Sequence, residues 1–267
     1  MNTQDFHEWS PRSQVFLIDP PVWRVELFGG LRLARGAFTR TDFRTHRTGS
    51  VLGYLAYFRG KWHPRHLLAE LFWPEDLPER ALRSLETALR TLSLELEPPG
   101  IEPGTILLQE RERVCLSGRA VLTDVAEFRE RIELACQCHR RARRLRLLLV
   151  AVEQYRPDLL PGHRDEWLLP AQAELEDLYI WAALTLTRDL SAAGHLDESL
   201  RVARRALEVD PLAEKLHRQV ARLLQRRGDL PSPSLNRRPA QVISAASSDA
   251  GGPGPSGSRR LTGEEPA

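Results

Sequence analysis

A Trp-Pro pair between two helical patterns is the feature that most constrains what this chain can fold into. The stretch LLAELFWPEDLPERALRSLETALRTL spans residues 67–92, with the pair at Trp73-Pro74. The residue before a proline is pushed out of the α region, so the first helix must end at Trp73. Pro78 suits the first turn of a new helix, and Asp76 and Glu79 have the spacing of a capping box. Two helices joined by a short turn are therefore predicted.

The second of these helices carries a single apolar stripe. Leucines recur at intervals of three and four residues from Leu82 to Leu96, and Pro98-Pro99-Gly100 then ends the pattern. A stripe of this width buries one face of a helix and leaves the opposite face open. The first helix of the pair is expected to brace the second, whose outer face is left free to enter a groove.

Alternating apolar residues predict strands on both sides of the helices. Trp23, Val25 and Leu27 alternate before Gly29-Gly30, which indicates a hairpin with one buried face. A further helix is expected over residues 49–58, ahead of the two already described. Residues 105–117, TILLQERERVCLS, predict a second hairpin with charged residues at its tip. Strands, three helices and a β-ribbon in this order are the pattern of a winged helix-turn-helix.

From Thr123 to about residue 230 the sequence pattern is helical throughout. Gly194-His195 and Gly228-Asp229 are separated by 34 residues, which is the tetratricopeptide period. Ala206 and Pro211 fall where that repeat places a small residue and its terminating proline. The second repeat has its first helix but no recognisable second one. The apolar edge that this leaves is open to a partner, to another copy of the chain, or to solvent.

The two ends of the chain differ from the rest in composition. Residues 1–21 contain three prolines and predict a flexible arm, while residues 231–267 are rich in Pro, Gly and Ser and predict a disordered tail. The sequence has no apolar run of 18 residues and no signal-peptide core, so a cytoplasmic protein without membrane attachment is expected.

Neither a cofactor, a metal nor catalysis is expected. The three cysteines are too few for a disulfide scaffold, and Cys136 and Cys138 lack a second pair of ligands at metal-binding spacing. Phosphate loops, dinucleotide fingerprints and nucleophile elbows are also missing from the sequence. A non-enzymatic function is therefore predicted.

Three blocks of sequence occur along the chain in a characteristic order. They are Leu71-Phe72-Trp73-Pro74, then Asp124-Val125-Ala126-Glu127-Phe128, then Leu159-Leu160-Pro161-Gly162 followed by Asp165-Glu166-Trp167. Together they resemble bacterial transcriptional activators of the Streptomyces antibiotic regulatory protein type. That family joins an OmpR/PhoB-like winged helix to a bacterial transcriptional activation domain.

The resemblance implies a mainly α fold with small β-sheets. A winged helix-turn-helix DNA-binding domain would occupy residues 22–122. A tetratricopeptide-like α-helical activation domain would follow at residues 123–230 and would be incomplete, since its last helix is not found in the sequence.

The resemblance also implies a site and its partners. The protein would bind double-stranded promoter DNA, contact RNA polymerase or itself, and form a homodimer on DNA. The recognition helix would run from Pro78 to Leu96. The residues expected to contact DNA are Arg80, Arg83, Ser84, Thr87, Arg90 and Thr91 on this helix, and Arg111 and Arg113 on the wing. Arginine can pair with guanine edges, and hydroxyl side chains suit phosphate or base contacts.

The charge of the recognition helix keeps an alternative open. Four glutamates, Glu79, Glu86, Glu95 and Glu97, are expected to offset Arg80, Arg83 and Arg90, so the helix is not net basic. The net charge of the whole chain is only +2. Since phosphate neutralisation supplies much of the affinity for DNA, weak binding or dependence on dimerisation is expected. The favoured function is a DNA-binding transcriptional activator; the alternative is a protein-interaction module whose winged helix has lost DNA binding.

Overall fold

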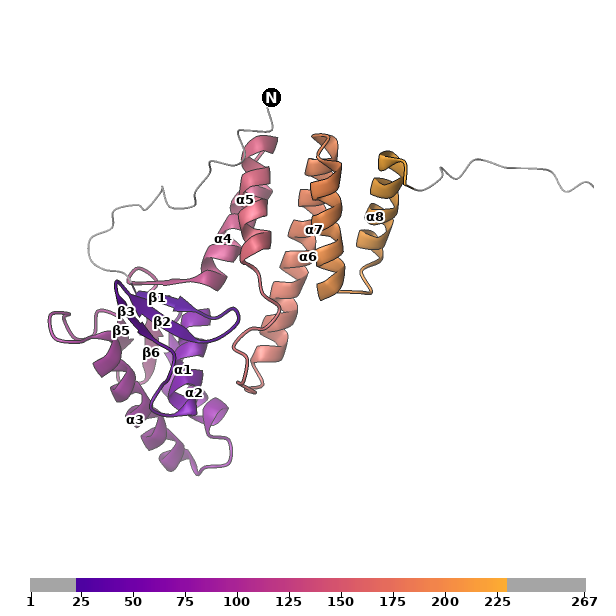
Figure 1. Cartoon of the computed structure of the whole chain (residues 1–267). Helices are drawn as coiled ribbons and strands as arrows, with labels where there is room; N and C mark the ends of the chain where they lie inside the picture. The colour runs from indigo at the N-terminus through magenta and orange to yellow at the C-terminus, as the bar shows by residue number, and fades with distance from the viewer. Residues whose placement is uncertain (1–22, 230–267) are drawn as a thin grey trace, which may run out of the picture. The chain divides into compact units, whose positions relative to one another are not determined.

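Trp23, Val25 and Leu27 are all buried in the computed structural model of the protein, which describes residues 23–229 (Figure 1). Trp23 and Val25 lie in β1 (Trp23–Glu26), which pairs antiparallel with β2 (Arg32–Arg35) across a glycine turn, as predicted. The predicted arm and tail lie outside the described residues.

Two strands without a sequence signal complete this first sheet. β3 (Phe38–Arg40) pairs antiparallel with β2, and β7 (Val121–Thr123) pairs in parallel with β1, so the strand order is β3-β2-β1-β7. Each has three residues, which is too short to display the alternation by which a strand is recognised. The β7 strand returns the chain to β1 immediately before the helical half begins.

Three helices and a second sheet follow the order predicted for a winged helix-turn-helix. The helices are α1 (His46–Tyr57), α2 (Arg65–Phe72) and α3 (Pro78–Leu96). The second sheet consists of β4 (His63–Pro64), β5 (Leu107–Gln109) and β6 (Arg113–Leu116) in the order β4-β6-β5. The wing is the hairpin of β5 and β6, which are antiparallel.

The Trp73-Pro74 break is confirmed, but the predicted capping box is wrong. Trp73 caps the end of α2, and α3 begins at Pro78 with Leu77, rather than Asp76, at its N-cap position. Pro78 holds Leu77 in the extended region at φ −60° and ψ 144°, so the helix cannot start earlier. Asp76 is thereby one residue too far away to cap and instead pairs with Arg80, with 3.4 Å between Nε and Oδ1.

The second half of the described chain is formed by five helices that lie side by side in sequence order (Figure 1). They are α4 (Asp124–Gln137), α5 (Arg141–Gln154), α6 (Leu168–Ala192), α7 (Leu196–Val209) and α8 (Glu214–Arg227). Gly194 and Gly228 follow α6 and α8 with φ of 91° and 88°, a left-handed conformation that favours glycine. The 34-residue period therefore corresponds to two equivalent helix ends.

The start of α4 is joined to the end of β1 by one buried carboxylate. Asp124 accepts hydrogen bonds from the backbone N–H groups of Leu27 at 2.9 Å, Phe28 at 2.9 Å and Val125 at 2.8 Å. Thr123 caps the same helix through its hydroxyl, which accepts from Ala126 N at 3.1 Å. The Asp124 to Phe128 block is therefore a structural junction.

The Leu159 to Gly162 block packs onto helix α1. The backbone N–H of Leu160 donates to Leu27 O at 2.9 Å, and Leu160 itself is buried with a φ of 50°. A Cβ added at Gly53 of α1 would lie only 2.7 Å from Leu160 Cδ1. Leu160 and α1 therefore approach each other closely only because residue 53 is glycine.

Polar contacts from α1 reach the same region of the helical half. Tyr57 donates to Glu174 Oε2 at 3.1 Å, and burial raises the pKa of Tyr57 to about 12. Asp165 forms an ion pair with Arg47 at 3.0 Å. Neither Asp165 nor Glu166 caps the following helix, because α6 starts at Leu168 with Trp167 at the N-cap position and has no side-chain cap.

These contacts give residues 23–229 a shared core. Buried residues from β1, α1 and α3 belong to the same hydrophobic cluster as those from α4, α5 and α6. The described residues accordingly all lie in one compact unit. The division at residue 122 stays a prediction.

We expect Asp124→Ala to lower the free energy of unfolding by about 1–3 kcal/mol, because buried N–H donors lose their acceptor. Urea unfolding followed by circular dichroism measures the change. Asp177→Ala is the matched control, since Asp177 is exposed on α6. Equal midpoints for the two variants would contradict the junction role of Asp124.

Candidate nucleic-acid interface

Helix α3 has one buried face and one open face, as its leucine stripe predicts. Leu85, Leu89, Leu92 and Leu96 are buried, and Leu82 is half-buried. Trp23 fixes the end of the helix by donating from Nε1 to Leu96 O at 2.7 Å. The opposite face is thereby held outward from the core.

The predicted contact residues of α3 fall into two groups. Arg83, Thr87 and Arg90 are exposed on the outward face, one helical turn apart. Within the described part of the chain, the side chains of Arg83 and Arg90 make neither an ion pair nor a hydrogen bond. Arg80 is exposed but paired with Asp76, and Ser84 and Thr91 are half-buried at the edge of the face.

The two threonines of this face use their hydroxyl hydrogens internally. Thr87 Oγ1 donates to Arg83 O at 2.9 Å, and Thr91 Oγ1 donates to Thr87 O at 3.0 Å. Each oxygen keeps a lone pair that can accept, and each side chain keeps a methyl group. These residues therefore offer a ligand an acceptor and an apolar contact.

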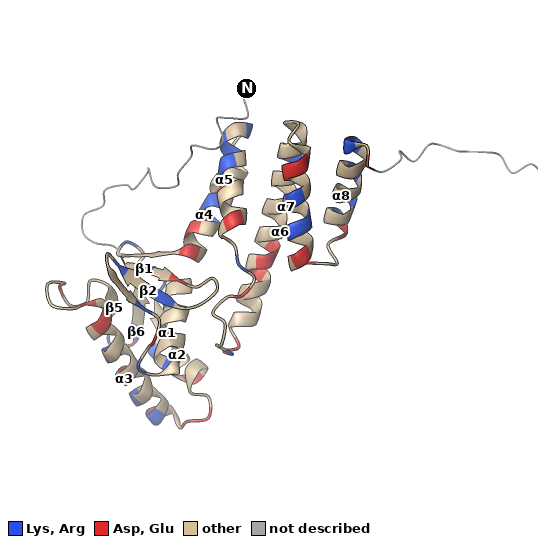
Figure 2. Ribbon diagram, in the orientation of Figure 1, with Lys and Arg blue, Asp and Glu red and all other residues tan. Residues whose placement is uncertain are grey.

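The expected balance of charge along the recognition helix is wrong for two of the four glutamates that were counted with it. Glu95 pairs with Arg40 of β3, and Glu97 turns toward the loop that follows the helix. Of these four glutamates, only Glu79 and Glu86 are exposed. Figure 2 shows basic and acidic residues interspersed along α3. The outward face is therefore less acidic than the sequence suggests, because tertiary contacts remove two carboxylates from it.

Glu97 connects the recognition helix to the wing. Its carboxylate accepts from the backbone N–H groups of Gly104 at 3.0 Å, Ile106 at 2.8 Å and Leu107 at 3.0 Å. A second link is formed by Gln109 Nε2, which donates to Ser93 Oγ at 3.3 Å. Helix α3 and strand β5 are thus joined by several hydrogen bonds, which fixes the wing relative to the helix.

The two arginines predicted on the wing differ in their surroundings. Arg113 donates from Nε to Glu110 at 2.7 Å and stacks over the Trp62 ring at 4.7 Å. Its hydrogen bond to Glu110 raises the pKa of Arg113 and lowers the pKa of Glu110. Arg111 at the tip is exposed and has no side-chain partner among the described residues. Arg111 is therefore the open cation of the wing, and Arg113 supports the hairpin.

Three residues near the interface are not predicted from the sequence. Arg65 ties α2 to the wing by donating to Gln109 Oε1 at 2.9 Å and to Glu110 O at 3.2 Å. Leu94 is 71% exposed on the outward face of α3, between the arginines and the end of the helix. The only sequence signal for Leu94 is its place outside the leucine stripe. The sequence around Arg65 and Gln109 contains no signal of their roles, because these roles depend on contacts between α2, α3 and the wing, which are separate in sequence.

Within residues 23–229, no group of three or more His, Cys, Asp or Glu side chains could hold a metal ion. All three cysteines are free, and burial raises the pKa of Cys115. None of the helices in this part of the chain has the length and apolar character needed to cross a membrane.

Comparisons with known proteins agree with this architecture. Residues 123–230 match the family of the bacterial transcriptional activator domain. Among solved structures, the chain is similar to Mycobacterium tuberculosis EmbR in complex with a low-affinity phosphopeptide, with a TM-score of 0.67 and 20% sequence identity. The similarity covers 79% of this chain and 57% of the EmbR chain, and at this identity it supports the fold alone. The comparison with curated proteins found no match. The predicted fold class is confirmed.

We expect Glu97→Ala to loosen the connection between α3 and the wing. Loss of an acceptor for buried N–H groups costs about 1–3 kcal/mol, so amide exchange at Ile106 and Leu107 should accelerate by about tenfold or more. Hydrogen exchange read by mass spectrometry or NMR measures this. Glu102→Ala is the control, because the Glu102 side chain is exposed in the same loop. Unchanged exchange at both amides would show that Glu97 does not hold the wing.

Proposed function

We propose that this protein, a bacterial transcriptional activator of the Streptomyces antibiotic regulatory protein type, acts by binding promoter DNA through α3 and the wing. One observation carries the proposal. Arg83 and Arg90 are exposed and unpaired on the face of α3 that lies opposite its buried leucines. A helix presented in this way fits the major groove, where arginine donates to guanine O6 and N7.

The remaining candidates divide between base and phosphate contacts. Thr87 offers a methyl group to a thymine methyl, since its hydroxyl hydrogen already bonds to the backbone. Ser84 and Thr91 lie at the edge of the face, where they suit phosphates. Arg80 and Arg113 are ion-paired and would exchange a carboxylate for a phosphate. Arg111 contacts the backbone beside the groove entered by α3.

The helical domain is proposed to act on proteins. Stacked helix pairs present surfaces to other chains, and a domain of this family is named for activation of transcription. We assign to it contact with the transcription machinery, RNA polymerase included, or with a second copy of the chain. A homodimer on DNA would double the number of phosphate contacts and raise an affinity that is weak for one copy.

The alternative function is a protein-interaction module whose winged helix has lost DNA binding. Glu86 favours it, because this carboxylate is exposed beside the outward face and repels phosphate. Leu94 favours it too, since an exposed leucine suits a protein surface better than a phosphate backbone. The alternative predicts no DNA binding at low salt.

We expect Arg83→Ala together with Arg90→Ala to weaken binding to DNA from upstream of the protein's own gene by at least about tenfold, because each good arginine–guanine pair contributes about 1–3 kcal/mol. Fluorescence anisotropy over a range of salt concentrations measures the affinity. The slope of log affinity against log salt should become shallower by about one for each phosphate that the variant no longer neutralises.

The control is Arg204→Ala together with Arg222→Ala, which removes the same charge from exposed, unpaired positions on α7 and α8. Its affinity should equal that of the unaltered protein. If the unaltered protein binds random DNA equally well, sequence-specific readout is wrong. Absence of any binding at low salt would favour the alternative function.

A further inference from the structure

Helix α8 has an uncovered face that is equivalent to a covered face of α6. The 34-residue period relates Gly194 to Gly228 and hence aligns the end of α6 with α8. The α6 residues one repeat earlier, Ala183, Leu186, Thr187 and Leu190, are all buried, and α6 packs against α7. Ser199 of α7 confirms the packing by donating from Oγ to Thr187 O at 2.7 Å.

The equivalent residues of α8 have no helix over them. They are His217, Val220, Ala221 and Leu224, of which His217 and Ala221 are exposed and Val220 and Leu224 are half-buried. Val220 and Leu224 pack on one side against a small cluster of Leu200, Ala203 and Leu223. The face is therefore an apolar strip of Val220, Ala221 and Leu224 with His217 at one end, and it lacks its repeat partner among the described residues. We name it the α8 face.

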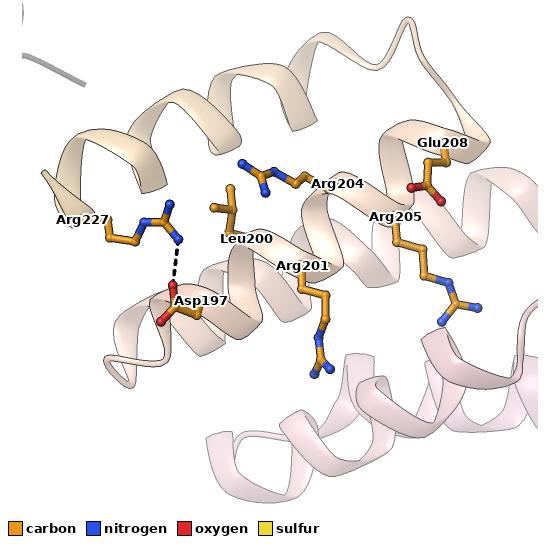
Figure 3. Close-up of a pocket in the computed structure, with 7 residues that line it drawn as sticks. All are labelled: Asp197, Leu200, Arg201, Arg204, Arg205, Glu208 and Arg227. Carbon is orange, nitrogen blue, oxygen red and sulfur yellow. Dashed lines mark hydrogen bonds and ion pairs between the residues drawn. The ribbon is translucent and has the colours of Figure 1, made fainter. Parts of the chain in front are cut away.

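The charges around the α8 face are mostly positive. Helix α8 carries Lys215 and four arginines against a single acidic residue, Glu214; of these arginines, Arg218 pairs with Glu214, Arg226 donates to Ser191 of α6, and Arg222 lies outside the face. Beside this helix, a groove on α7 is lined by Leu200, by Arg204, which makes no ion pair within the described chain, and by Glu208 (Figure 3). Arg227 closes one end of this groove by pairing with Asp197 at 2.8 Å, whereas Arg201 and Arg205 point away from α8 (Figure 3).

The apolar strip and the charges near it favour one of the possible occupants over the others. A second copy placing its own α8 here would bring two basic helices together, and like charges across an interface are unfavourable. Residues 231–243, which follow in the sequence, include three prolines and two arginines. The prolines disfavour a helix, and the arginines do not complement a basic surface. An apolar strip with a basic border instead fits a helix whose own apolar stripe is bordered by carboxylates.

We propose that an acidic amphipathic helix of a partner protein packs on the α8 face, in the position that α7 occupies on α6, with its carboxylates toward Arg204. The proposal goes beyond the proposed function, because it assigns a particular surface of the activation domain and the chemistry of what binds it. It does not require DNA binding.

The probe is a fluorescent peptide copied from residues 194–211, in which Arg201, Arg204 and Arg205 are replaced by Glu. Residues 194–211 contain α7, the helix whose apolar side already fits the equivalent face of α6. The same peptide with its arginines retained is the matched probe of opposite charge. Anisotropy with the full chain should show binding of the acidic peptide at least about tenfold tighter than that of the arginine peptide.

Three variants of the full chain, one of them a control, test where the peptide binds. Arg204→Glu should weaken binding of the acidic peptide by about tenfold or more, because it sets like charges against each other. Arg222→Glu is the matched control and should have a smaller effect. Arg222 is the repeat equivalent of Arg188, which stays exposed on α6 although α7 covers that helix. Ala221→Glu changes an exposed residue at the centre of the face and should also weaken binding.

Several results would overturn the proposal. Equal weakening by Arg204→Glu and Arg222→Glu would indicate only general attraction of charge. Equal binding of the two peptides would refute the selection for acidic residues. If sedimentation finds a dimer that Ala221→Glu dissociates, a second copy occupies the face instead. Ala221→Glu should leave DNA affinity unchanged, so failure here is distinguishable from failure of the proposed function.

Discussion

The carboxylate of Asp124 is the point on which the arrangement of this protein depends. It accepts hydrogen bonds from the backbone N–H groups of Leu27 and Phe28, where β1 ends, and of Val125, where α4 begins. Burial raises the pKa of Asp124, and the three backbone donors act against this shift. A buried carboxylate is tolerated only where such donors compensate for the loss of water. The winged-helix part and the helical part are thereby joined through backbone as well as side chains.

Helix α1 extends this junction because it has neighbours on two sides. It packs with α2 and α3 in the winged helix, while Gly53 accommodates Leu160 and Tyr57 bonds to Glu174 of α6. A helix with both sides buried must be apolar over most of its surface, and nine of its twelve residues are buried. The loop before α6 therefore has a packing role, which accounts for its Leu-Leu-Pro-Gly sequence without invoking a ligand. A protein whose two halves share a core in this way presents α3 and α8 on one unit.

Much of this fold is predictable from local sequence, and the exceptions have physical reasons. The Trp73-Pro74 break, the leucine stripe and the 34-residue period are signals of local structure, and the structure confirms them. Pro78 holds Leu77 in the extended region, so α3 begins one residue later than the capping-box spacing of Asp76 predicts. The roles of Glu95 and Glu97 depend on β3 and on the loop before β5, which are remote from any pattern within α3. For the candidate site, sequence alone identifies the exposed arginines but not which of them are already paired.

The two open faces of the molecule differ in a way that favours different partners. The outward face of α3 presents Arg83, Thr87 and Arg90, polar groups that suit the wet and strongly charged interfaces formed with DNA. The α8 face contains Val220 and Leu224, and the basic residues of α8 lie outside this apolar strip. An apolar centre with a polar rim is typical of a protein interface. Because desolvated apolar groups contribute little against a phosphate backbone, the α8 face has no advantage as a second DNA site. Its arginines instead select among proteins, since a basic border rejects basic helices and admits acidic ones.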